Sequence, residues 1–282
     1  MVREPAVAGQ FYEGGREPLL EQVRGCFLRQ PGPGSLPKAH SERVVKAAIV
    51  PHAGFMFSGY AAAHAYRAIG EAKKPDVFIV IGPNHSLPMS SVCLEGFETP
   101  LGIVKADKKL GELICRSTGL EAGSEAQVYE HSVEVQLPFL QFIYGKDMPQ
   151  FVPIVVSDVD YVRLGKGIKK AIADYGKRVC VLASSDFTHY GPGYGYRPFS
   201  ANVRENLAKL DNAAFEFIAK KDSRGFMDYI DRTGATICGK YPICVLLEAI
   251  DIKKATKLCH YSSGDIAGSY TNSVDYISAV FE

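Results

Sequence analysis

The sequence predicts an α/β fold, a single-domain sandwich in which a mixed, largely parallel central sheet is flanked by helices. Three observations support this prediction. Apolar runs rich in β-branched residues recur along the 282 residues, several of these runs are nearly continuous rather than alternating, and helical patterns fall between them. Continuous apolar runs are typical of strands buried on both faces, and the alternation of strand and helix favours an α/β architecture.

The elements can be assigned in chain order. The predicted strands are residues 44–50, 76–81, 151–156, 178–183, 256–261 and 274–281. The predicted helices are residues 16–29, 58–69, 107–117, 131–144, 160–174, 200–220, 222–231 and 242–251. Ser58 is expected to cap the second of these helices, and Pro242 to lie in the first turn of the last. A Pro/Gly-rich stretch at residues 31–42 predicts a surface loop. With no internal repeat, we expect one domain spanning residues 1–282.

Composition and charge argue against several classes of function. The formal net charge of +1 gives no support to binding of nucleic acid or of an anionic membrane. The longest apolar runs are too short to span a bilayer, and the N-terminal residues include no apolar segment of signal-peptide length. The seven cysteines are scattered and form no CxxC pair, which argues against a disulfide framework and a zinc ribbon. We therefore expect a cytoplasmic protein. The sequence contains no GxGxxG, P-loop or GxSxG motif.

Histidine and aspartate residues follow four predicted strands at the points where these strands end. They are His52, His85, the pair Asp186 and His189, and Asp265. In open α/β sheets, ligands bind at the carboxyl ends of the strands. His52 and His85 are 33 residues apart (85 − 52), about one strand-helix-strand repeat, so neighbouring strands would bring both imidazoles to one crevice. Two neutral imidazoles there would begin a divalent-metal site. The alternative is two loop histidines that bond backbone groups.

Asp186 and His189 lie three residues apart in the segment SSDFTHYG. One turn of helix would place both side chains on the same face. The carboxylate could then orient the imidazole or complete a metal shell, and the imidazole could act as a general acid or base. In the alternative interpretation, Asp186 caps a turn and His189 is exposed.

Cys238 and His131 are two further candidates. Cys238 precedes Gly239 and a predicted helix, and a cysteine near a helix N-terminus is expected to have a lowered thiol pKa, which suits a soft metal ligand or a redox thiol. A packed loop cysteine is the alternative. His131 begins the helical pattern at 131–144 and either reaches the site or is an ordinary residue of a helix start. The tyrosine-rich segment 190–199 is either a lid over the pocket or an exposed loop. The remaining histidines are assigned no role: His40, His64 and His260.

Taken together, these segments resemble the Memo family. The matching motifs run along the whole chain in order: REPAVAGQFY, PHAGFMFSG, GPNH, EHSVEVQLPFL, SSDFTHYG, TICGKYPI and SYTNSVDYISAVF. The family is similar in fold to class III extradiol ring-cleaving dioxygenases, which hold non-haem Fe(II) with two histidines and a carboxylate. The resemblance implies that His52, His85 and Cys238 bind a divalent metal, most simply Fe(II), with Cu or Zn as alternatives. It also implies that Asp186 and His189 line the same pocket.

The resemblance is compatible with more than one function. In the first, the protein is a metal-dependent, dioxygenase-like oxidoreductase in which His189, oriented by Asp186, takes a substrate proton and His131 assists the reaction of oxygen. In the second, a non-catalytic scaffold keeps the pocket and binds a small molecule or a peptide. The second is motivated by Cys238, because a thiolate stands where the dioxygenases use a carboxylate. The resemblance further implies a functional link to AMMECR-type and radical-SAM proteins, as in the AmmeMemoRadiSam system, and a pathway step shared with a radical-SAM partner is a third hypothesis.

Overall fold

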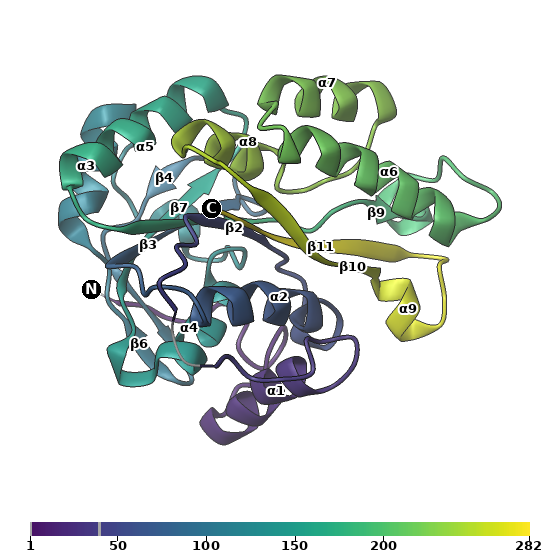
Figure 1. Ribbon diagram of the computed structural model, residues 1–282, viewed down its shortest axis with the longest axis horizontal. Helices are drawn as coiled ribbons and strands as arrows, with labels where there is room; N and C mark the ends of the chain where they lie inside the picture. The colour runs from purple at the N-terminus through teal and green to yellow at the C-terminus, as the bar shows by residue number, and fades with distance from the viewer. Residues whose placement is uncertain (1, 39–40) are drawn as a thin grey trace.

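The computed structural model describes residues 2–38 and 41–282 (Figure 1). In this part of the chain the central sheet comprises β2 (Ala47–Val50), β3 (Val77–Pro83), β4 (Ser91–Val92), β7 (Gln150–Val156), β8 (Val179–Ser184), β9 (His189–Tyr190), β10 (Ala255–Ser262) and β11 (Ser273–Phe281). The order is β10-β11-β2-β8-β3-β7-β4, and β9 pairs with β11 off this path. Strands β2, β8, β3 and β7 are parallel, whereas β4 and β11 pair with them antiparallel. The predicted mixed, largely parallel sheet is confirmed.

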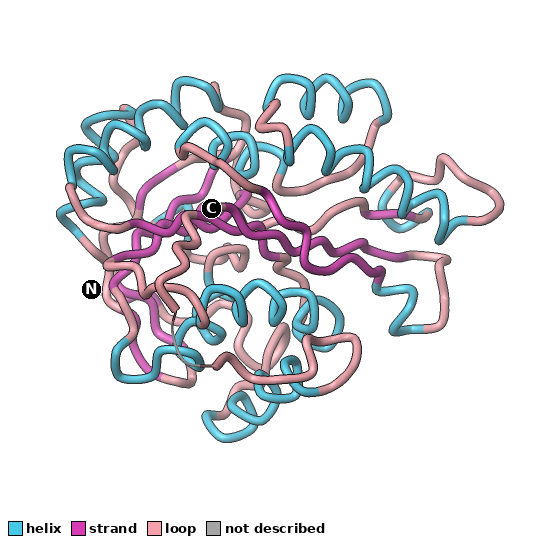
Figure 2. The backbone as a smooth tube through the Cα atoms, in the orientation of Figure 1, coloured by secondary structure: helices cyan, strands magenta, loops and turns pink. Residues whose placement is uncertain are grey.

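Helices cover both faces of this sheet, and the strands lie between them (Figure 2). The helices are α1 (Arg16–Leu28), α2 (Phe55–Gly70), α3 (Lys108–Thr118), α4 (Leu137–Tyr144), α5 (Tyr161–Tyr175), α6 (Val203–Ala219), α7 (Ser223–Thr233), α8 (Lys240–Ala249) and α9 (Ser263–Ala267). Alternate side chains of a strand point to opposite faces. In β2, Ala47 and Ile49 join the core under α3, α5, α6, α7 and α8, whereas Ala48 and Val50 join the core under α1, α2 and α4.

Each predicted strand and helix corresponds to an observed element, but two helix starts differ from the prediction. The helix expected from residue 131 begins at Leu137, because a turn and the 3-10 helix Glu134–Gln136 precede it. Helix α2 begins at Phe55, so Ser58 is not its cap; the Ser58 hydroxyl donates to the Ala53 carbonyl at 2.7 Å. Pro242 lies in the first turn of α8, as predicted.

Several short elements were not predicted. Strands β1 (Val2–Arg3), β5 (Gly96–Thr99) and β6 (Gly102–Val104) form a separate sheet in the order β1-β5-β6. Strands of two to four residues are too short for a periodic apolar pattern, which explains why the sequence does not reveal them. The described residues of the predicted loop 31–42 form neither helix nor strand, and His40 lies outside the described residues.

The carboxyl ends of β2, β8 and β3 meet at one edge of the sheet, and this edge carries the predicted site residues. Strands β2 and β3 are not neighbours, since β8 lies between them. The spacing of His52 and His85 required neighbouring strands, and this condition is not met. Both rings nevertheless reach the space above the end of β8, with centroids 5.2 Å apart. In the described part of the chain, no helix combines the length and apolarity needed to cross a bilayer.

Candidate metal centre

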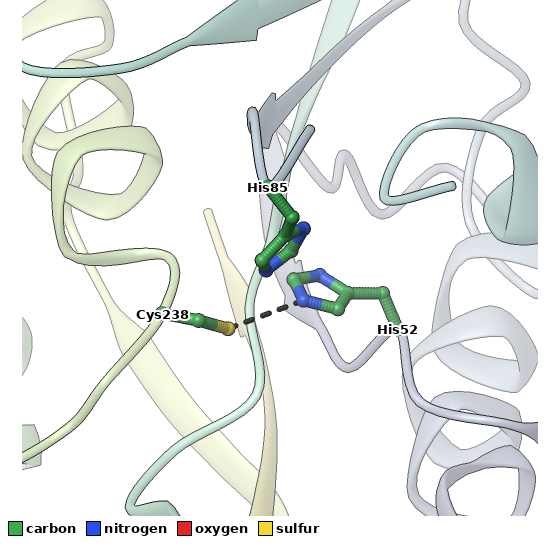
Figure 3. A group of neighbouring side chains, drawn as sticks. All are labelled: His52, His85 and Cys238. Atoms are coloured by element: carbon green, nitrogen blue, oxygen red, sulfur yellow. Dashed lines mark hydrogen bonds between the residues drawn. The ribbon is translucent and has the colours of Figure 1, made fainter. Parts of the chain in front are cut away.

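The side chains of His52, His85 and Cys238 point toward one another from three separate loops (Figure 3). One ligand atom from each lies within 4.8 Å of the other two. Nε2 of His52 is 3.1 Å from Sγ of Cys238. His52 is buried, Cys238 is partly buried, and the His85 side chain is 36% exposed. The centre is therefore closed on the His52 side and open to solvent beside His85.

Hydrogen bonds fix the tautomer of His52. The Ser184 hydroxyl donates its only proton to the carbonyl of Ser132 at 2.6 Å. It also accepts from Nε2 of Gln136 at 2.8 Å, which donates in addition to the Pro51 carbonyl. Nδ1 of His52 lies 2.9 Å from the same hydroxyl, and because the hydroxyl proton is already used, Nδ1 must be the donor. Nε2 of His52 is then unprotonated, and its lone pair faces Cys238.

Glu130 plays the same part for His85, and it is not among the residues that the sequence motifs indicate. Its buried carboxylate accepts from Nδ1 of His85 at 3.1 Å and from the His85 backbone N–H at 2.5 Å. It also accepts from the backbone N–H groups of His131 and Ser132. With Nδ1 of His85 donating, Nε2 is free to bind a metal, an arrangement common among metal-binding histidines. Glu130 directly precedes His131, and this adjacency is the signal in the sequence that could have identified it.

Electrostatics favour an unprotonated Glu130. Burial alone would raise the pKa of its carboxyl, but the hydrogen bond from His85, the charges of His85 and His131, and the Ser132 N–H lower the pKa to about 2. Glu130 is thus a carboxylate at neutral pH and a strong acceptor.

Asp186 lies at the centre but does not share a helical turn with His189. Residues 185–187 form neither helix nor strand, and the Phe187 N–H bonds to the Asp275 carbonyl of β11 at 2.8 Å. Oδ1 of Asp186 accepts from the backbone N–H groups of His52 at 2.8 Å and Ala53 at 3.3 Å. Asp186 therefore holds the loop that carries His52, and the helical turn that would place Asp186 and His189 on one face is not present.

His189 presents an unused donor or acceptor to the centre. Its Nε2 is buried and has no hydrogen-bond partner in the described residues, and one of its nitrogens lies within 4.8 Å of ligand atoms of Asp186 and Cys238. Buried polar atoms are nearly always bonded, so this nitrogen indicates a position for a ligand or a solvent molecule. The ring of Tyr194 packs against that of His189 with centroids 5.0 Å apart, so the tyrosine-rich segment reaches the centre.

His131 completes a group of close imidazoles. Its ring stacks on that of His85 at 4.8 Å and lies 5.5 Å from the ring of His52. On the other side, the ring of Phe11 lies 4.6 Å away. Of the other two histidines that received no role, His64 bonds the carbonyl of Pro31, and His260 lies on β10 away from this group.

The buried imidazoles of the centre are neutral. Burial, followed by the charges of the neighbouring histidines, lowers the pKa of His52 well below its usual value. Burial is also the main cause that lowers the pKa of His131 and of His189 to about 4. A neutral imidazole has a lone pair available for a metal or a proton.

Cys238 does not have the lowered pKa that its place before α8 suggested. Burial, and then the nearby charge of Asp186, raise the pKa of the thiol well above its usual value. The metal-free protein therefore carries a neutral thiol, and a bound metal would have to displace its proton. A neutral thiol is a weaker nucleophile than a thiolate, so the raised pKa argues against the redox-thiol alternative.

The backbone brings Cys238 this close because Gly239 has no side chain. A Cβ added at Gly239 would lie 2.2 Å from Cβ of Ser185, which shows how tightly the loop before α8 packs on the end of β8. The Gly239 N–H donates to the Ser185 hydroxyl at 3.1 Å. The backbone therefore bends closely against β8 at Gly239.

The donor set suits a transition metal. Two imidazole nitrogens and one sulfur match the preferences of Zn, Fe(II) and Cu(I). The unpartnered Nε2 of His189 and the exposed edge of His85 leave room for further ligands. The residues present thus fit a bound metal ion.

The fold and this centre together define a mixed α/β protein with a two-histidine, one-cysteine group at the carboxyl edge of its sheet. The family described as Memo-like protein matches residues 3–280. A MEMO1 family protein of Pyrobaculum aerophilum is 38% identical to this chain, over 99% of this chain and 99% of its own length. A MEMO1 family protein of Methanopyrus kandleri is 34% identical, over 100% of this chain and 99% of its own length. A MEMO1 family protein of Saccharolobus solfataricus is 39% identical, over 100% of this chain and 99% of its own. The chain belongs to the Memo family.

A solved structure supports the fold independently. The uncharacterised protein JW3007 from Escherichia coli K12 superimposes with a TM-score of 0.57 over 85% of this chain and 100% of its own. The two sequences are only 12% identical, so this likeness concerns the fold alone.

Proposed function

We propose that the protein is a metal-dependent oxidoreductase of the dioxygenase-like type, with a metal bound by His52, His85 and Cys238. The observation that carries the proposal is the orientation of the donors. Ser184 and Glu130 accept the Nδ1–H of the two histidines, so both Nε2 lone pairs are free beside the Cys238 thiol. Two imidazoles and one sulfur favour iron, copper or zinc, and the resemblance to ring-cleaving dioxygenases favours Fe(II).

The residues around the donors can supply proton transfer. Bound Fe(II) would provide redox chemistry and open coordination positions. Nε2 of His189 is buried, unpartnered and neutral, so it can accept a proton from a substrate hydroxyl. His131 is also neutral and can donate or accept a hydrogen bond beside His85. Asp186 holds the backbone of His52 and Ala53 in place, which makes it a positioning residue in this proposal.

The experiment is anaerobic reconstitution with Fe(II), followed by metal analysis. We expect about one iron per chain in the wild type and at least tenfold weaker binding in Cys238→Ser and His52→Ala. Cys259→Ser is the matched control, because Cys259 is also a partly buried free cysteine but lies on β10. Oxygen uptake is then measured with a panel of catechols. Iron that remains bound in Cys238→Ser would overturn the metal assignment, and uptake no faster than in His52→Ala would overturn ring cleavage.

A second candidate is a non-catalytic scaffold that binds a peptide or a small molecule. A cavity of about 400 Å³ supports it; its lining includes Phe11, Met56 and Phe57 but none of the three metal donors. The Met56 side chain is 66% exposed, and Phe11 contacts His131. Apolar side chains together with a few polar ones, here Gln10, Glu13 and Gln22, are typical of the lining of ligand sites. Partner or ligand binding that persists unchanged in metal-free Cys238→Ser would favour this function over the first.

The cellular setting is part of the proposal. We place the protein in the cytoplasm, and its seven free thiols support a reducing compartment. The family resemblance suggests that it works with AMMECR-type and radical-SAM proteins in a shared pathway, with no nucleic acid or membrane as partner. Co-purification of such proteins from cells of the source organism tests this link.

A further inference from the structure

A second group of potential metal ligands lies apart from the three donors of the centre, where α6 crosses the far part of β10 and β11 (Figure 1). It consists of Asp211 on α6, His260 on β10 and Asp275 on β11. One ligand atom from each lies within 4.8 Å of the other two. Only residues 279–281 of β11 pair with β2, so Asp275 lies on the part of the strand that extends past the end of β2.

Both carboxyl groups are buried without a compensating positive side chain. Asp211 is 0% exposed and Asp275 is 2% exposed. In the described part of the chain, neither carboxyl group forms an ion pair with lysine or arginine. The basic group that contacts Asp275 is the imidazole of His260, whose Nε2 lies 3.4 Å from Oδ2. Arg204 lies on the adjacent cavity wall but pairs with Asp265 at 2.8 Å. Two buried carboxylates cannot both be charged in this setting unless a cation joins them.

The hydrogen bonds leave one oxygen available. Oδ1 and Oδ2 of Asp211 accept from the hydroxyl and the backbone N–H of Thr188, at 2.5 and 3.3 Å. Oδ1 of Asp275 is buried and receives no hydrogen bond from any described donor. Burial and the charge of Asp275 raise the pKa of Asp211 well above its usual value, which is the behaviour of two carboxyl groups that compete for one proton. With one proton between them, the two carboxyl groups are hydrogen-bonded to each other. When that proton is lost, a cation must offset the two charges, and Oδ1 of Asp275 offers it a buried ligand atom.

Solvent can reach the group from one side. His260 and Asp275 line a cavity of about 310 Å³. The His260 side chain is 13% exposed, so an ion entering this cavity would meet the imidazole of His260 and the carboxyl group of Asp275 first. Asp211 closes the site from behind.

We propose that Asp211, Asp275 and His260 form a second binding site for a divalent cation. Two carboxylates offset the charge of the ion, and the imidazole adds one nitrogen. This set favours Mn²⁺, Fe²⁺ or Zn²⁺ and contains no sulfur ligand, unlike the first centre. Metal bonds of about 2.0–2.2 Å place two ligands of one ion roughly 3–4 Å apart, so only small rotations of the three side chains are required. The site does not depend on the proposed oxidoreductase function.

Mn²⁺ binding tests the proposal, because Mn²⁺ prefers oxygen ligands to thiolates. Chelator-treated full-length protein is titrated with Mn²⁺, and free ion is measured by electron paramagnetic resonance. The titration is repeated in His52→Ala, which removes a ligand of the first centre. We expect one Mn²⁺ per chain from this site in both proteins, and at least tenfold weaker binding in Asp275→Asn and in His260→Gln.

Glu205→Gln is the matched control. Glu205 lines the same cavity but is exposed and lies outside the cluster, so affinity should stay within about twofold. Mn²⁺ should also raise the melting temperature of the His52→Ala protein and not that of its Asp275→Asn derivative. Absence of Mn²⁺ and Zn²⁺ binding in His52→Ala would overturn the proposal. Equal affinity in wild type and His260→Gln would overturn it as well, and His260→Gln keeps the test decisive if Asp275→Asn fails to fold.

Discussion

Two buried glutamates four residues apart, Glu130 and Glu134, serve different parts of the molecule. Glu130 accepts hydrogen bonds from His85 and from the backbone around His131. Glu134 binds Arg3 at 2.6 Å and Tyr12 at 2.6 Å. One carboxylate orients a ligand of the candidate metal centre, and the other fastens the N-terminal segment to the body of the protein.

The role of each buried carboxylate follows from the groups that it contacts. Arg3 bridges the two regions, because its guanidinium also donates to the carbonyl of Glu130 at 2.6 Å. Glu134 has a full positive charge beside it and is completely buried, so its loss would leave an unpaired charge. The partners of Glu130 are backbone N–H groups and the imidazole of His85, so its loss should weaken metal binding as well as the fold.

The largest expected effect is the loss of stability in Glu134→Ala. The buried Arg3 guanidinium would lose its carboxylate, and we expect the free energy of unfolding to fall by about 3–5 kcal/mol. Urea denaturation measures this change. Glu282→Ala, which breaks the more exposed pair with Arg43, should cost at most about 1 kcal/mol. Recovery of most of the loss in Arg3→Met/Glu134→Met would support the unpaired charge as its cause, and a loss below 1 kcal/mol in Glu134→Ala would contradict the interpretation.

The next effect concerns pH and Glu130. The pKa of Glu130 is lowered from 4.5 to about 2, so its contribution to stability is present above pH 4.5 and is lost as pH falls toward 2. This corresponds to about 3 kcal/mol between the two limits. The difference in unfolding free energy between wild type and Glu130→Gln should shrink as pH falls from about 5 to 3, measured by urea denaturation at each pH. A difference that stays constant over this range would show that the neighbouring groups do not lower the pKa of Glu130.

Metal affinity should then separate the two glutamates. In Glu130→Gln, the side-chain amide no longer offers a charged acceptor to Nδ1 of His85, and we expect Fe(II) affinity to fall about 10–100-fold. Anaerobic titration measures it. Glu125→Gln, an exposed change five residues earlier, should leave affinity unchanged. Unchanged affinity in Glu130→Gln would contradict its positioning role.

The smallest effect is expected for Ser184→Ala. This change removes the acceptor that fixes the tautomer of His52. We expect Fe(II) affinity to fall roughly tenfold, the lower end of the range for residues that hydrogen-bond a metal ligand. Ser278→Ala is the control, because Ser278 is equally buried in the sheet but its hydroxyl has no partner among the described residues. Equal losses in both variants would indicate general destabilisation and not an effect on His52.

The sequence determined the fold class and the principal elements, because apolar periodicity records which faces of a strand or helix are buried. It also placed His52, His85 and Cys238 at loops that follow strands or precede a helix. Only the tertiary structure decided that β8 separates β2 and β3, and that the loop before α8 packs on the end of β8. Strand order and loop contacts join residues far apart in the chain, and local pattern carries no record of them.

The same reason explains what the sequence did not reveal about charge. In the sequence, Glu130 and Ser184 are ordinary polar residues. Their roles come from His85, 45 positions from Glu130, and from His52, 132 positions from Ser184. Likewise, Asp211 and Asp275 are 64 positions apart (275 − 211) and become a pair only in the fold. The pKa of Cys238 follows burial and Asp186, although the helix start alone suggested the opposite direction. Burial and proximity set these properties, and both exist only once the chain has folded.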